Sequence, residues 1–205
     1  MSLILSFMNV STPLCFVNRP HLELALAQAV QTQGPTVDLN HWDVSGIQDF
    51  SHLFNPHRYS YLKDFQGRID AWDLSRATDT SFMFFESSFN GDISKWNVSQ
   101  VTKGFGMFYR SSFSQDISSW TFEQLQMGGF MFRDCPLPMK HFPDFPNIQN
   151  MVDSAWLFMG SVLDPTTGQA TGSMSPEHIQ SCLYQIQLQR HLRDEGLEPT
   201  PKHRL

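Results

Sequence analysis

The sequence predicts an α/β repeat protein, a short solenoid with one parallel sheet, capped by an N-terminal helix and followed by a C-terminal helix. The first observation is a run of tryptophans at intervals of 30, 24 and 24 residues: Trp42, Trp72, Trp96 and Trp120. The second is that apolar residues recur at fixed distances from each tryptophan. Self-similarity at a period of about 20–50 residues indicates a solenoid, in which each unit buries its apolar face only against its neighbours.

Positions in each repeat are counted from its tryptophan. Apolar residues stand at −3 (Leu39, Ile69, Ile93, Ile117), at +5 (Ile47, Ala77, Val101, Leu125) and at +11/+12 (Leu53-Phe54, Met83-Phe84, Met107-Phe108, Met131-Phe132). Phenylalanine also stands at −7 of the last three repeats, as Phe65, Phe89 and Phe113. We expect these columns to form one core, in which the tryptophan rings are stacked in a buried ladder.

Each repeat is predicted to contain a short strand and a short helix. Around the tryptophan the apolar spacing is two residues, as at Trp96 and Val98, which is typical of a strand. Beyond it, apolar residues follow three- and four-residue steps, which are typical of a helix. Two sets of polar residues fit this unit: serines that would cap the helix (Ser45, Ser75, Ser99) and aspartates that would hold a turn before the strand (Asp38, Asp92, Asp116).

The chain divides into three parts. Residues 1–35 are predicted to form an N-terminal cap, and residues 36–160 four clear repeats followed by a decayed one. Residues 161–205 would be a linker, a helix and a tail. In the decayed repeat, Ile148 and Met151 would take positions +5 and +8.

Helices are predicted near both ends of the chain. The first covers 18–33, with Asn18 as its N-cap and Gly34 after its last turn. The second covers 175–193. Residues 1–15 are apolar but have no basic residue before the apolar stretch, so we expect a cap of the solenoid there. A signal or lipoprotein leader is the alternative.

Two groups of residues are candidates for binding a protein. The six extra residues of the first interval lie within 55–64, and an insertion in one repeat forms a loop that is often on the binding face. The loop carries residue types suited to an interface: Arg58, Tyr59, Tyr61 and Lys63. The second group is a polar strip beside the tryptophans: His41, Asp43, Asp73, Lys95 and Asn97. The alternative for the loop is that it is a surface loop without a binding role. The alternative for the strip is that its Asp and Asn side chains only form hydrogen bonds with the backbone.

Composition narrows the class of partner. The 205 residues have a net charge of −6 and a pI near 5.7. Phosphate binding needs a basic surface, so neither nucleic acid nor an anionic membrane is expected as a partner. No stretch reaches the ~18 apolar residues that span a membrane. The widely spaced Cys15, Cys135 and Cys182 fit reduced thiols in the cytoplasm better than a disulfide framework or a zinc site.

No motif in the sequence points to catalysis, a cofactor or a metal, so we expect a protein that is not an enzyme. Two weaker alternatives remain. His52 and His57 are close enough in sequence to suggest a metal or acid–base site. Cys135 with His141 suggests a thiol nucleophile.

The amino-acid sequence of the repeats resembles that of a known family. Residues 89–108 (FNGDISKWNVSQVTKGFGMF) and 113–132 (FSQDISSWTFEQLQMGGFMF) are similar to the repeats of the BspA-like leucine-rich-repeat family, which also occur in mycoplasma lipoproteins. The resemblance covers residues 37–135. It implies a right-handed leucine-rich-repeat-like solenoid and a protein-binding role, and the family motif contains no catalytic residue. The family's usual methionine at +8 is replaced in this chain by Phe50, Thr80, Gly104 and Gly128.

These observations favour a non-enzymatic, cytoplasmic protein of a bacterium or phage that holds one protein partner, as an inhibitor or immunity protein does. A toxin or another effector is the kind of partner we expect. The alternative is a secreted or surface-exposed adhesin or effector that binds a host protein, which is the habit of the family that the repeats resemble.

Overall fold

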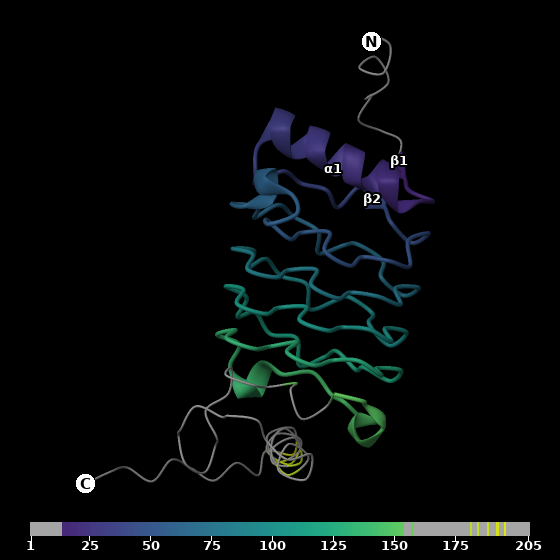
Figure 1. Cartoon of the computed structure of the whole chain (residues 1–205), viewed down its shortest axis with the longest axis vertical. Coiled ribbons are helices and arrows are strands. Elements are labelled where there is room, and N and C mark those ends of the chain that lie inside the picture. The colour runs from purple at the N-terminus through teal and green to yellow at the C-terminus, as the bar shows by residue number, and fades with distance from the viewer. Residues whose placement is uncertain are drawn as a thin grey trace, which may run out of the picture.

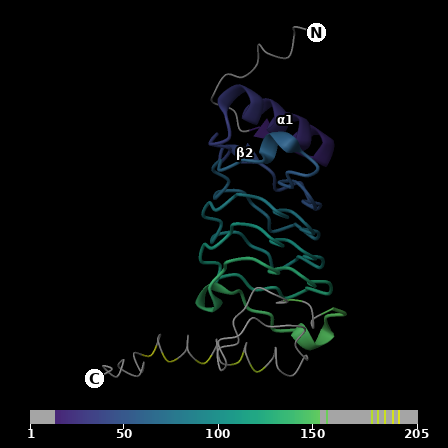
Figure 2. The ribbon, with the colours of Figure 1, turned by 60° about the vertical axis from the view of Figure 1, so that its left-hand side comes forward.

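In the computed structural model of the chain, residues 14–153 are described, together with 157, 181, 184, 188, 192 and 195. The elements are β1 (Leu14–Cys15), α1 (Arg19–Gln33), β2 (Trp42–Asp43) and three 3-10 helices, η1 (Ser60–Leu62), η2 (Met139–His141) and η3 (Ile148–Asn150). After α1 the chain winds in coils that lie one above another along the long axis (Figures 1 and 2). The helix α1 lies across one end of this stack, and the short η2 and η3 lie at the other (Figure 1).

The helix α1 covers the first repeat and is capped at both ends. Asn18 Oδ1 accepts a hydrogen bond from His21 N at 3.1 Å. Gly34 N donates to Val30 O at 2.9 Å, and its φ of 91° lies in the region that favours glycine. The buried face consists of Leu22, Leu26, Ala29 and Val30. The helix predicted over 18–33 is therefore confirmed, one residue shorter at its start.

Alternate backbone N–H groups of one repeat donate to the next repeat. From the second repeat to the third, the pairs are Thr80 to Lys103, Phe82 to Phe105 and Phe84 to Met107, at 2.8, 2.9 and 2.8 Å. Parallel bridges join the +7 residues Asp49, Asp79, Lys103 and Met127 in one column. The steps of this column equal the tryptophan intervals, so successive repeats stack in register.

The parallel pairing lies at a different place from the one predicted. Among the described residues, a strand forms beside a tryptophan only in the first repeat, where β2 pairs in parallel with β1 and Leu14 faces Trp42. In the second and third repeats, side chains bind the backbone there instead, and in the fourth an isolated parallel bridge joins Thr121 to Asp144. Asp73 Oδ1 accepts from Ser75 N at 2.8 Å, for example. The continuous ladder therefore runs through +7 rather than through the tryptophans.

The repeats also differ from the prediction in having turns where helices were expected. Within residues 36–153 the only helices are the 3-10 turns η1 to η3. Positions +8 to +15 form overlapping i to i+3 turns, as in Met107 N to Gly104 O and Tyr109 N to Gly106 O, both 3.1 Å. Position +10 has positive φ in all four repeats: His52, Phe82, Gly106 and Phe130. A left-handed residue interrupts a helix, while successive turns give the same three- and four-residue apolar spacing.

The core consists of aromatic columns that run along the stack. The +12 rings Phe54, Phe84, Phe108 and Phe132 are fully buried. Their centroids are 5.2, 5.4 and 5.7 Å apart and neighbouring rings are tilted by 3, 5 and 9°. The tryptophans, also buried, stack in two pairs: Trp42 with Trp72 at 6.3 Å, and Trp96 with Trp120 at 6.1 Å.

The decayed repeat has a different register from the predicted one. In the earlier repeats, the backbone N at position +6 donates to the backbone O at +6 of the repeat before it. Val152 N donates in the same way to Gln126 O, at 3.0 Å, so Val152 takes position +6. Met151 therefore takes position +5, which the sequence analysis gave to Ile148. The shift arises because Ile148 starts the extra turn η3. The predicted linker and the C-terminal helix over 175–193 lie outside the described residues, apart from the helical Ser181, Tyr184, Leu188 and Leu192.

Candidate protein-binding surfaces

The inserted loop over 55–64 folds on a buried asparagine. Asn55 O accepts from Arg58 N at 3.1 Å and from Tyr59 N at 2.9 Å, and Asn55 Oδ1 accepts from His57 N at 2.9 Å. Leu62, in η1, is fully buried in the core. The loop is thus a compact surface feature with its own anchors.

A network of ion pairs and hydrogen bonds ties α1 to the first repeat beside this loop. Arg19 Nε donates to Glu23 Oε1 at 2.6 Å, and Arg19 Nη1 donates to Asp49 Oδ1 at 2.7 Å. Arg19 Nη2 also donates to Ser51 O. The Tyr59 hydroxyl is buried nearby and makes no hydrogen bond within the usual limits of distance and angle. Burial and, to a smaller extent, the nearby Glu23 raise the pKa of Tyr59.

The four predicted loop residues therefore have different surroundings. Arg58 and Lys63 are exposed. Tyr59 and Tyr61 are half-buried against the core, with ring centroids 5.8 Å apart, and burial raises the pKa of Tyr61 to about 12. Only the two basic side chains of this set are exposed, and the guanidinium of Arg58 lies 5.4 Å from the ring centre of Tyr59.

The polar strip is held by local turns. Asp43, Asp73 and Asn97 each accept a hydrogen bond from the backbone N of the serine two residues later, at 3.0, 2.8 and 3.0 Å. The hydrogen bonds from Ser45 also hold the pKa of Asp43 below its usual value. The prediction that Ser45, Ser75 and Ser99 cap helices is therefore wrong, because these serines donate to Asx turns. Asp38, Asp92 and Asp116 hold similar turns, as predicted.

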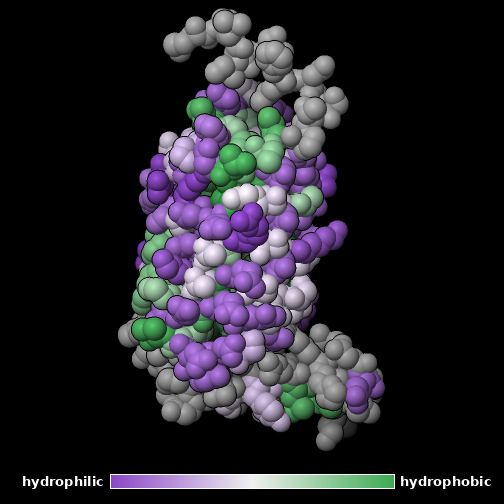
Figure 3. All heavy atoms as spheres, turned by 90° about the vertical axis from the view of Figure 1, so that its right-hand side faces the viewer, coloured by the Kyte–Doolittle hydropathy of each residue, from purple (hydrophilic) through white to green (hydrophobic). Residues whose placement is uncertain are grey.

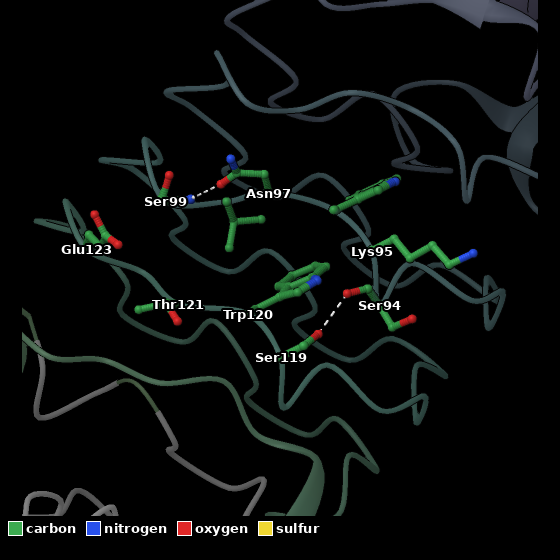
Figure 4. A pocket seen from close by; sticks show the side chains of 10 residues that line it. Ser94, Lys95, Asn97, Ser99, Ser119, Trp120, Thr121 and Glu123 are labelled. Carbon is green, nitrogen blue, oxygen red and sulfur yellow. Dashed lines mark hydrogen bonds between the residues drawn. The ribbon is translucent and has the colours of Figure 1, made fainter.

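Two members of the strip, Lys95 and Asn97, are among the residues that line a shallow hollow between the third and fourth repeats (Figure 4). The hollow has a volume of about 450 Å³, and the stacked Trp96 and Trp120 lie among its lining residues. Ser119 Oγ donates to a backbone oxygen of the previous repeat at 2.8 Å on one side of it. His41, Asp43 and Asp73, the other members of the strip, do not line it.

Polar side chains dominate one long face of the stack. Figure 3 shows this face covered mostly by hydrophilic residues, with hydrophobic ones gathered near the α1 end and along one edge. A face of this kind suits a protein contact that is made through a small number of apolar anchors within a polar surround.

Sequence reasoning missed a third surface, which we call the aromatic ridge. It consists of five half-exposed rings from three repeats: Phe82, Phe85, Phe105, Tyr109 and Phe130. Neighbouring centroids are 5.3 to 6.2 Å apart, and His52 stacks on Phe82 at 5.0 Å. The positive φ at +10 turns the backbone, so that the ridge rings at +9, +10 and +13 are half-buried at the surface while the residues at +11 and +12 are buried in the core. The available signal was that these aromatics occupy positions outside the core columns.

Charged side chains line the ridge. Glu86 accepts hydrogen bonds from His57 at 2.5 Å and from Arg110 at 3.3 Å. Both contacts lower the pKa of Glu86, and the one with His57 has the larger effect. Arg110 also approaches Asp134 at 3.6 Å. The guanidinium of Arg133 lies 5.2 Å from the ring centre of Tyr109 and an equal distance from that of Phe130.

The residues that suggested an enzymatic site all contact other groups of the fold. His52 stacks on Phe82, and His57 pairs with Glu86. The Cys135 thiol donates to Phe113 O at 3.1 Å, and burial raises its pKa to about 11, which opposes formation of a thiolate. His141 contacts Ser114 O through Nδ1 at 3.2 Å. In the described part of the chain, no group of three or more His, Cys, Asp or Glu could hold a metal.

The geometry is that of stacked repeats that present columns of side chains on a polar surface. The chain belongs to a family described as mycoplasma proteins of unknown function, DUF285, whose model matches residues 24–144. No curated protein and no solved structure matches the chain. None of the helices in the described residues is both long and apolar enough to cross a membrane.

Proposed function

We propose that this chain is a short right-handed solenoid of the BspA-like leucine-rich-repeat type, and that it is a binding protein rather than an enzyme. Its task in this proposal is to hold one protein partner and block it, as an inhibitor or immunity protein does, in the cytoplasm. The observation that supports a binding role is the column order of the surface. Because repeats stack in register, exposed side chains at one position recur along the stack and form extended surfaces on a rigid frame.

The partner would be a protein because the exposed groups suit one. Side chains of aromatic and basic type stand together at the loop and on the ridge, and such residues dominate the energy of protein interfaces. The net charge of −6 disfavours nucleic acid, whose binding depends on neutralised phosphates.

Affinity capture tests this proposal. The full-length protein, immobilised on beads, is exposed to lysate and to culture medium of the cells that make it, and retained proteins are identified by mass spectrometry. A loop variant carries Arg58→Ser and Lys63→Ser and leaves the half-buried tyrosines intact. A strip variant carries Lys95→Ser and Asp73→Ser.

We expect one protein, retained from the lysate in about equal molar amount, and its loss with one of the two variants would assign the contact to that surface. A protein retained only from the medium would replace the cytoplasmic inhibitor by a secreted effector or adhesin. If nothing is retained above empty beads from either source, the binding role is wrong.

A further inference from the structure

We propose that the aromatic ridge is the docking surface for the apolar face of an amphipathic α-helix in the protein partner. This inference rests on the proposed function, since it takes the partner to be a protein, and it adds the surface and the chemistry of the segment that binds there.

The first step is the backbone conformation beneath the rings. Phe82 and Phe130 have φ of 55° and 57°, which is a rare conformation for a bulky side chain. Glycine fits this position, because Gly106 occupies it in the third repeat with φ 60°. The chain thus displays two half-exposed rings where they strain the backbone, and strain retained at an exposed site points to a function there.

The second step is the spacing of the rings along the stack. The centroids of Phe82 and Phe105 are 5.3 Å apart, and those of Phe105 and Phe130 are 5.4 Å apart. Repeats joined by parallel bridges advance about 4.8 Å along the stack and an α-helix advances about 5.4 Å per turn, so a helix parallel to the stack brings one apolar side chain to each of the three repeats. Same-face side chains of an extended strand are about 6.6 Å apart and would lose register by more than ~1 Å at each repeat.

The third step is the tilt between neighbouring rings. The planes of Phe82 and Phe105 meet at 59°, and those of Phe105 and Phe130 at 90°. Such a surface has furrows and no flat platform on which bases could stack. Furrows about one repeat apart accept the ridge of side chains that an α-helix presents at three- and four-residue steps.

The fourth step is the rim. Arg110 lies between Glu86 and Asp134, at 3.3 and 3.6 Å, so the ridge is bordered by charges of both signs. An apolar centre within a polar border is the usual anatomy of a protein interface. A helix with a leucine-type apolar stripe and charged flanks is complementary to this pattern.

The test uses a display library of helical peptides about 15 residues long. Ala, Glu and Lys occupy the outward positions, and Leu, Ile, Met and Phe vary at i, i+4, i+7 and i+11. The library is selected against the full-length protein. The Kd of the best peptide is then measured by fluorescence anisotropy on wild type and on Phe85→Ser, Phe105→Ser, Phe85→Leu and Gln31→Ser.

We expect an amphipathic helix whose Kd rises at least about tenfold with either serine variant. Phe85→Leu keeps an apolar surface and should stay within about threefold of wild type, and Gln31→Ser, on the exposed side of α1, should bind like wild type. The thermal midpoint of each variant shows that it is folded. A scrambled peptide of the same composition should not bind.

The inference is overturned if no peptide of the library is enriched, or if the folded serine variants bind the best peptide as tightly as wild type does. Its failure is separable from failure of the proposed function. A native partner captured equally by wild type and by Phe85→Ser keeps the binding role and removes the ridge from it.

Discussion

The indole Nε1 of Trp96 donates a hydrogen bond of 3.0 Å to the carbonyl oxygen of Ile69 in the preceding repeat. That oxygen also accepts from Trp72 N at 3.1 Å, so both of its lone pairs are used. The same arrangement recurs one repeat earlier at Leu39 and one repeat later at Ile93. The tryptophan column therefore joins neighbouring repeats by directed bonds as well as by buried area.

Substituting Trp96 by Phe tests this bond. The change leaves the ring buried but removes the only donor of the indole, and Ile69 O loses one of its two partners. We expect the free energy of unfolding to fall by about 1–3 kcal/mol. Urea denaturation measures it, with Trp72→Phe and Trp120→Phe as parallel cases that should lose similar amounts. Values within ~0.5 kcal/mol of wild type for all three would mean that the bond contributes little.

The phenylalanine column predicts a larger loss. Phe108 is fully buried between Phe84 and Phe132, at 5.4 and 5.7 Å. Phe108→Ala should lower the free energy of unfolding by about 3–5 kcal/mol, through lost burial and an unfilled cavity. Urea denaturation checks it against Phe85→Ala on the ridge, which should cost less because that ring is half-exposed. Equal losses at the two sites would place the core elsewhere.

Two glycines separate backbone strain from crowding. Gly34 and Gly106 both have positive φ, but a Cβ at Gly34 meets nothing within 4 Å, whereas one at Gly106 comes 2.7 Å from the Phe82 ring. Gly34→Ala should cost about 1 kcal/mol through strain alone. Gly106→Ala should cost more, because the Phe82 ring must also move. The thermal midpoints decide: an equal drop in both variants would show that the ring yields freely.

Stability should fall at high pH because of Cys135. Burial raises the pKa of this thiol from 9.0 to about 11, so the folded protein keeps its proton where the unfolded chain has lost it. The stabilisation that comes from keeping this thiol protonated is fully present below about pH 9. It is lost as pH rises towards 11, which lowers the free energy of unfolding by about 2–3 kcal/mol in all.

Unfolding curves between pH 8 and 11 measure this loss, and Cys135→Ala is the reference because Tyr61 titrates in an overlapping range. The variant should have the shallower pH dependence. Identical slopes in the two proteins would show that the thiol does not titrate with folding.

Much of the core and one cap could be predicted from the sequence. Asn18 and Gly34 bound a helix by local chemistry, and their geometry is as expected. The tryptophans and the +12 phenylalanines, such as Trp96 and Phe108, are buried in every repeat. A residue that recurs at one position of each repeat has the same neighbours in each, so its burial can be predicted from the repeat.

Other features could not be read from apolar spacing. Steps of three and four residues fit both a helix and a series of turns, and only the left-handed backbone at positions such as Gly106 separates the two. The same reversal decides that Phe105 lies outside while Phe108 lies inside. At the inserted loop, the contact with α1 half-buries Tyr59, which no local pattern foretells.

The most direct test of the central claim, that outer side chains of these stacked repeats hold one protein, is the mass of a reconstituted complex. Multi-angle light scattering on the purified chain mixed with its captured partner should give the mass of a one-to-one complex. A folded variant of the contacting surface, at the ridge or at the loop, should leave the two proteins separate. Separate elution with the wild-type chain, or a complex that survives every surface variant, would contradict the account.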